Sequence, residues 1–146
     1  MTKDDLESFV EQLQEEIDRE ERELYSEIVI EESKSPYHMY RMENPDGSAE
    51  FTGTCGDTMW IYLRVEGNRI VEGSFLTDGC GATTAVGSRL MRMIEGKTID
   101  QAQMMTDDQL IESLGGLPEE NLHCAELAMT ALYRAIDDLY AKGVAT

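Results

Sequence analysis

The feature that most constrains the fold is a change in the spacing of apolar residues near the middle of the chain. Across residues 59–66 apolar side chains occupy every second position, which is the period of a strand with one buried face. After Gly79 and Gly81 the apolar residues recur every three or four positions up to residue 94, which is the period of a helix. The change of period predicts a protein that contains both a sheet and helices.

Turn signals divide the extended region into three strands. Gly67-Asn68 is a two-residue hairpin turn that joins the alternating run to a returning strand over residues 69–77. A short strand over residues 49–54 is expected to pair beside them in a small antiparallel sheet. Because helical segments both precede and follow these strands, we predict an α+β fold with helices on one face of the sheet.

The remaining segments have helical spacing and recognisable caps. Residues 6–17 carry apolar side chains at helical intervals, and residues 24–29 either continue that helix or begin another. Thr98 is expected to cap a short helix. The capping box Thr106-Asp107-Asp108-Gln109 predicts the start of a further helix. A last helix follows Pro118 and has an apolar face.

The charge of the chain is strongly negative and unevenly distributed. Its 146 residues include 30 acidic and 12 basic residues, a net charge of -18, and residues 1–32 alone hold 13 acidic and 3 basic ones. We expect residues 1–23 to form an acidic helical extension and residues 24–146 to form one domain. The extension is either a solvated helix face or a docking surface for a basic partner. Phosphate backbones and anionic lipids repel such a chain, so neither nucleic acid nor membrane is expected as a partner.

The chain has no sequence signal for export or for a membrane span. Its first residues are acidic and lack the apolar run of a signal peptide, and no segment approaches roughly 20 apolar residues. The 3 cysteines are an odd number without a Cys-x-x-Cys pair, which argues against a disulfide framework. A reducing, cytoplasmic compartment is therefore expected.

Each cysteine lies at the boundary of a predicted element. Cys55 precedes a strand, Cys80 lies between a strand and a helix, and Cys124 is near the start of the last helix. The amide groups at a helix start stabilise a thiolate, so we expect them to lower the pKa of the Cys80 and Cys124 thiols. Asp57 follows Cys55 by two positions, and in an extended segment both side chains would point the same way.

These cysteines, with Asp57 and His123, have the composition of a metal site. Three thiolates with an oxygen or nitrogen donor suit tetrahedral zinc or thiolate-held iron. A carboxylate is a weak ligand for a soft metal, so a site that includes one should release its cargo. A single cysteine taken alone is more often an inert buried residue, and it is the joint pattern that supports the metal hypothesis.

Short motifs in a fixed order carry a family resemblance. They are Cys55-Gly56-Asp57, Gly79-Cys80-Gly81-Ala82, and Leu117-Pro118 followed by His123-Cys124. Gly96-Lys97-Thr98, Leu24-Tyr25-Ser26-Glu27 and Pro36 add to them. Together these motifs resemble the IscU/NifU-like iron–sulfur cluster assembly scaffold family, over about residues 24–141.

The resemblance implies a scaffold, not an enzyme, on which an iron–sulfur cluster of the 2Fe-2S type is assembled and then passed to apo iron–sulfur proteins. A cysteine desulfurase would supply the sulfur. Cys55, Cys80 and Cys124 would be cluster ligands and sulfur acceptors. Asp57 would keep the cluster transferable, and His123 would be an alternative ligand. The resemblance also implies that zinc can occupy the same site.

The chain departs from the family in the segment before the last helix. In the family this segment is Leu-Pro-Pro-Val-Lys, and a heat-shock chaperone recognises it. In this chain the corresponding residues are Leu117-Pro118-Glu119-Glu120-Asn121. Two acidic residues and an asparagine replace Pro-Val-Lys, which argues against recognition by that chaperone and removes a positive charge near the site.

Two other functions share these residues. A zinc-bound persulfide acceptor of the SufU type would use the same ligands, but that type carries an insertion between the second and third motifs, and the interval from Cys80 to Cys124 resembles the scaffold type. A thiol hydrolase or transferase would use Cys124 as nucleophile and His123 as base. Adjacent residues on a helix point about 100° apart, which makes that pair geometrically unfavourable.

Overall fold

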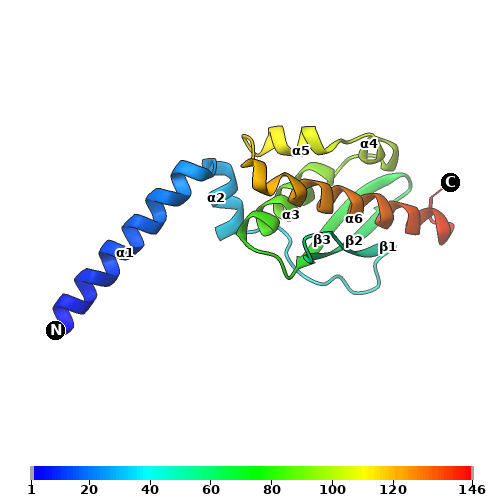
Figure 1. Ribbon diagram of the computed structural model, residues 1–146. Coiled ribbons are helices and arrows are strands. Elements are labelled where there is room, and N and C mark those ends of the chain that lie inside the picture. The colour runs from blue at the N-terminus through cyan, green and yellow to red at the C-terminus, as the bar shows by residue number, and fades with distance from the viewer. Residues whose placement is uncertain (1, 146) are drawn as a thin grey trace.

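The structure is a computed structural model that describes residues 2–145, and it combines one three-stranded sheet with helices (Figure 1). In chain order the elements are α1 (Lys3–Leu24), α2 (Glu27–Lys34), β1 (Gly47–Thr52), β2 (Thr58–Glu66), β3 (Arg69–Thr77), α3 (Gly81–Ile94), α4 (Ile99–Gln103), α5 (Asp107–Ser113), the 3-10 turn η1 (Glu119–Asn121) and α6 (Leu122–Ala141). The predicted α+β class, with helices on one face of a small antiparallel sheet and an additional N-terminal helix, is confirmed.

The sheet has the order β1-β2-β3, and both pairings are antiparallel. Ile61 in the central strand pairs with Ala49 on one side and Phe75 on the other. The alternating residues Met59 and Ile61 are fully buried, as their period predicts. The first strand begins earlier than predicted and ends at residue 52, because residues 53–57 turn the chain into β2.

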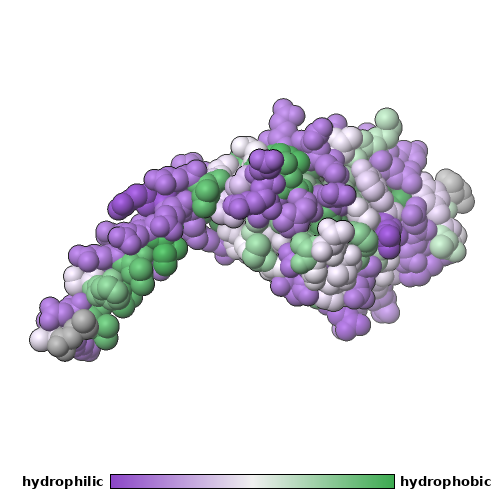
Figure 2. All heavy atoms as spheres, in the orientation of Figure 1, coloured by the Kyte–Doolittle hydropathy of each residue, from purple (hydrophilic) through white to green (hydrophobic). Residues whose placement is uncertain are grey.

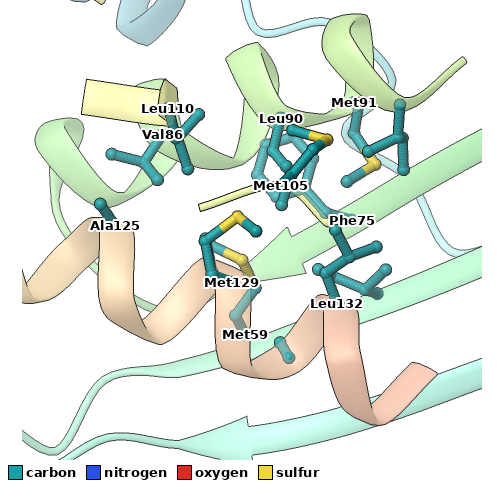
Figure 3. Packing of buried hydrophobic residues seen from close by; sticks show 14 of the residues in the cluster. Met59, Phe75, Val86, Leu90, Met91, Met105, Leu110, Ala125, Met129 and Leu132 are labelled. Atoms are coloured by element: carbon teal, nitrogen blue, oxygen red, sulfur yellow. The ribbon is translucent and has the colours of Figure 1, made fainter. Parts of the chain in front are cut away.

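The core lies between the sheet and two helices that cover one of its faces. α6 packs against β1 and β2, and α3 packs against β3. Figure 3 shows Met59 and Phe75 of the sheet meeting Leu90 of α3 and Met129 and Leu132 of α6. Full burial of one such side chain contributes about 1.5–3 kcal/mol to the free energy of folding. The packing of this layer therefore fixes the positions of the helices and strands that carry the site.

Polar caps set the helix boundaries. The Ser26 side chain accepts a hydrogen bond from the amide of Val29, so α2 is a separate helix and does not continue α1. The predicted caps at Thr98 and Thr106 are both confirmed as reciprocal capping boxes.

α1 differs from the other long helices because it projects away from the body of the molecule (Figure 1). None of its described residues is buried. Across residues 2–145, no helix combines the length and the apolar character that crossing a membrane requires.

Candidate functional site

The hairpin turn between β1 and β2 holds two of the predicted site residues, Cys55 and Asp57. The turn is closed by hydrogen bonds from the Gly53 amide to the Asp57 carbonyl, at 2.9 Å, and from the Gly56 amide to the Gly53 carbonyl, at 3.0 Å. Gly56 has a φ of 90°, in the left-handed region that favours glycine. The segment is therefore a turn and not extended, and this turn presents the two side chains at one end of the sheet.

The side chains of Cys55 and Asp57 meet His123, the second residue of α6. One donor atom from each of the three side chains lies within 4.8 Å of the other two. Cys55 is exposed, and the other two are partly exposed. A hollow beside the group is lined by Phe51 and Leu127, among others. A thiolate, a carboxylate and an imidazole at this spacing can ligate one metal ion and remain open to solvent.

Cys124 joins this group from the buried side through the hydroxyl of Thr83. The Thr83 Oγ1 lies 3.4 Å from the Cys124 Sγ and 3.4 Å from the Asp57 Oδ2. Thr83 is fully buried, and Cys124 is only 1% exposed. The His123 Nε2 is 3.7 Å from the Cys124 Sγ. Although adjacent residues on a helix point about 100° apart, these two side chains therefore come into contact.

Burial raises the pKa of the Cys124 thiol, and this is the largest effect on it. Hydrogen bonds from Thr83 and Asn121 oppose the rise, whereas the nearby thiolates of Cys80 and Cys55 add to it. The expected lowering of the pKa at a helix start is therefore wrong for Cys124, because loss of solvent outweighs the amide groups. A protonated, buried thiol is a poor nucleophile, which argues against the hydrolase alternative.

Cys80 lies at the N-cap of α3 and is exposed. Its sulfur lies outside the close group of Cys55, Asp57 and His123. It faces a second hollow, which Tyr25 of the α1–α2 junction also lines. The structure thus brings four of the five predicted residues into direct or bridged contact and places the fifth at the edge of the site.

Three residues beside the site were not among the predicted site residues. The Tyr25 hydroxyl donates to the Asn121 Oδ1 at 3.2 Å, and burial, followed by the Cys80 thiolate, raises the pKa of Tyr25. The side chain of Asn121 forms a hydrogen bond with Cys124. Thr83 could have been noticed from one signal: it is a polar residue among the inward-facing apolar positions of the helix after Cys80.

The fold and the donor atoms define a class of protein: a small α+β domain with an open thiolate–carboxylate–imidazole site at one end of its sheet. Residues 24–146 match the sequence profile of a family described as "NifU-like N terminal domain". The chain belongs to this family.

Named relatives support the assignment. The chain is 41% identical over 120 residues to "Iron-sulfur cluster assembly scaffold protein IscU 1" of Archaeoglobus fulgidus, a match that covers 82% of this chain and 78% of the relative. It is 35% identical over 121 residues to the IscU scaffold protein of Aquifex aeolicus, covering 81% of this chain and 77% of the relative. The crystal structure of a nitrogen-fixing NifU-like protein (N-terminal) from Brucella abortus has the same fold, with a TM-score of 0.65, 17% identity, and coverage of 80% and 94%.

Proposed function

We propose that this chain is a scaffold on which an iron–sulfur cluster is assembled and from which it is transferred. The observation that carries the proposal is the group of donor atoms from Cys55, Asp57 and His123, to which the Thr83 hydroxyl links Cys124. Membership of the NifU-like family supports it, as does the scaffold function for which the relatives are named.

The cluster, proposed to be of the 2Fe-2S type, is held by Cys55, Asp57, Cys80 and Cys124, with His123 as an alternative ligand. Cys124 is buried and provides a fixed anchor, whereas Cys55 and Cys80 are exposed and lie within reach of a partner. The carboxylate of Asp57 binds iron less firmly than a thiolate would, and this keeps the cluster transferable.

Sulfur reaches the site as a persulfide carried by a cysteine desulfurase. A thiolate of the scaffold attacks the terminal sulfur of the donor persulfide, the sulfur–sulfur bond of the donor breaks, and the donor cysteine leaves as a thiolate. Exposure makes Cys55 and Cys80 the residues that receive this sulfur. The scaffold then carries a persulfide, and an external reductant has to supply two electrons to release its outer sulfur as cluster sulfide and restore the thiolate. The chain catalyses no turnover of its own: it accepts sulfur and iron and delivers the product to apo iron–sulfur proteins.

The scaffold activity is assigned to residues 24–146, and residues 1–23 form a separate acidic extension. Free thiols require a reducing compartment, so we place the activity in the cytoplasm. No heat-shock chaperone is included among the partners, because Glu119, Glu120 and Asn121 replace the residues that such a chaperone reads.

A second candidate function is supported by the mixed donor set. A sulfur, an oxygen and a nitrogen donor close together also suit tetrahedral zinc. With zinc in place, the chain would relay persulfide to other proteins as a SufU-type acceptor.

Metal and acid-labile sulfide analysis of protein purified without oxygen separates the two functions. Iron with an equal amount of sulfide, and visible charge-transfer absorption, is the expected result. Tight stoichiometric zinc without sulfide would favour the persulfide acceptor. The Cys80→Ala variant should lose the parent's spectrum, and an unchanged spectrum would contradict the ligand assignment.

Cluster lability gives a second test. The Asp57→Ala variant should retain its cluster longer than the parent in transfer to an apo acceptor. Asp100→Ala is the matched control, because Asp100 is an exposed carboxylate near Tyr140, toward the other end of α6 from the site. Transfer from Asp57→Ala at the rate of the control, or faster, would remove the role given to Asp57.

A further inference from the structure

The projecting helix α1 has an apolar seam that no described part of the chain covers. Leu6, Val10, Leu13, Ile17 and Leu24 are 52%, 55%, 46%, 43% and 57% exposed. Figure 2 shows hydrophobic side chains along one side of the projecting helix, beside hydrophilic ones. An exposed apolar patch of this kind marks a site of interaction.

The spacing of the seam is that of a two-stranded coiled coil. From Leu6 to Ile17 its positions are separated alternately by four and three residues, a period of about 3.5, and the next position of the series is Glu20. In heptad terms, Val10 and Ile17 take the a position and Leu6 and Leu13 take the d position. β-Branched residues at a with leucine at d favour a pair of parallel helices. The regular part of the seam, residues 6–17, therefore suits one partner helix along a length of roughly 18 Å.

The flanks of the seam exclude a second copy of this chain as that helix. The e and g positions beside the seam, which set partner choice in coiled coils, hold four glutamates and no basic residue. They are Glu7, Phe9, Gln14, Glu16, Glu21 and Glu23. In a parallel pair of identical helices, Glu16 of one copy would face Glu21 of the other, and such like-charge contacts destabilise the pair. Lysine or arginine at the facing positions would instead form ion pairs.

We propose that α1 is a docking arm that forms a two-stranded coiled coil with a helix of another protein, apolar at a and d and carrying lysine or arginine at e and g. The same acidic flanks repel an anionic lipid surface. Glu21 and Tyr25, at the end of α1, line the hollow that contains Cys80. A helix bound along the arm is thereby brought beside this exposed thiol. The placement of a bound helix beside Cys80 has a role only if the proposed scaffold function is correct. The docking of a helix on α1 does not depend on that function.

A synthetic peptide tests the docking directly. The probe is a fluorescently labelled three-heptad helix with isoleucine at a, leucine at d and lysine at e and g, titrated with the full-length chain and followed by fluorescence anisotropy. Saturable one-to-one binding is expected, weakened about tenfold or more between low and high salt because exposed ion pairs are screened. The same peptide with glutamate at e and g should not bind.

Variants of α1 locate the binding surface without risk to the fold, because none of its described residues is buried. Leu13→Ala combined with Ile17→Ala should reduce the affinity for the lysine peptide by about a hundredfold, the effect of losing two buried anchors. Ser8→Ala combined with Gln12→Ala changes the opposite face and should bind like the parent. Alanine favours a helix in both pairs.

Three results would overturn the proposal: no binding of the lysine peptide, equal binding by both double variants, or a dimer of the parent in sedimentation velocity that Leu13→Ala with Ile17→Ala abolishes. The last result would assign the seam to a second copy of the chain. Iron and sulfide analysis of the same double variant should match the parent, so a failure of the docking arm is distinguishable from a failure of the scaffold function.

Discussion

The two longest helices of the molecule have similar lengths and opposite roles. α1 and α6 span 22 and 20 residues, and each has an apolar face. α6 buries ten of its described residues against the sheet and α3, whereas α1 buries none. α6 approaches β1 closely at Ala135 and Leu139, which lie against Gly47, while α1 surrounds its apolar seam with glutamates. An amphipathic pattern thus predicts that a face will be covered, and the residues beside that face indicate whether the cover comes from the same chain.

The largest expected difference is in global stability. Leu132 of α6 is fully buried, and Leu13 of α1 is 46% exposed. Leu132→Ala should lower the free energy of unfolding by about 2–5 kcal/mol, because it leaves a cavity in the core. Leu13→Ala should change it by less than about 0.5 kcal/mol. Urea unfolding followed by tryptophan fluorescence measures both, and comparable losses would show that α1 packs against the body.

A second effect depends on how closely α6 approaches β1. A Cβ added at Gly47 would lie 2.7 Å from the Leu139 Cδ2 and 2.8 Å from the Ala135 carbonyl oxygen. Gly47→Ala should therefore destabilise the fold by about 1–3 kcal/mol, because the helix backbone has to move. Gly81→Ala is the control, since its Cβ would meet only Ser33, at 3.8 Å. If both variants unfold at the same urea concentration, the close packing of α6 on β1 is incorrect.

The sequence predicted the elements of the fold because their signals are local. The alternation of apolar and polar residues predicted β2, and Gly67-Asn68 predicted the hairpin turn. The threonines at 98 and 106 predicted the starts of two helices, and the structure confirms both. Each of these features depends on residues within a few positions of one another. The boundary of β1 was less well predicted, because it depends on the turn at Gly56 and on pairing with β2.

The arrangement of the candidate site was harder to predict because it depends on contacts between distant parts of the chain. Thr83 is 26 positions from Asp57 and 41 from Cys124. No local sequence pattern can therefore predict that its hydroxyl lies between them. The pKa of Cys124 was predicted in the wrong direction because its position near a helix start is visible in the sequence, whereas its burial is not. The sequence motifs identified the donor residues, but not which of them would be buried.

A third prediction concerns this buried anchor of α6 and follows from the position of Thr83. Thr83→Val removes the hydroxyl that links Asp57 to Cys124 and keeps the shape of the side chain. Loss of one hydrogen bond of about 0.5–1.5 kcal/mol should speed the release of iron by roughly twofold to tenfold. The measurement is anaerobic transfer of iron from the loaded protein to a chelator.

Thr83→Ser is the matched control, because it keeps the hydroxyl and removes only a methyl group. Iron release from this variant should stay near the rate of the parent, although its free energy of unfolding falls slightly. Equal acceleration in both variants would show that packing around residue 83, and not its hydroxyl, holds the site together.

The smallest expected effect compares the same capping motif on the arm and on the body. Thr2 and Asp5 form a capping box at the start of α1, with both hydrogen bonds at 3.2 Å, and Thr106 and Gln109 form one at the start of α5. Thr106→Ala should lower the global free energy of unfolding by about 1 kcal/mol, because α5 packs on the body. Thr2→Ala should leave the global value unchanged and only speed hydrogen exchange in the first turn of α1.

The pH dependence of that local effect has a defined sign. Hydrogen bonds from the backbone and side chain of Thr2 lower the pKa of Asp5 below its usual 3.8. A carboxyl with a lowered pKa stabilises the folded turn fully above its unfolded pKa, and this support is lost as the pH falls through the lowered value. The protection factor of the first-turn amides, which is the intrinsic exchange rate at each pH divided by the observed rate, should therefore fall on acidification in the parent and less so in Thr2→Ala. If Thr2→Ala instead shifts the midpoint of global unfolding, then the arm and the body unfold together, and the contrast between α1 and α6 does not hold.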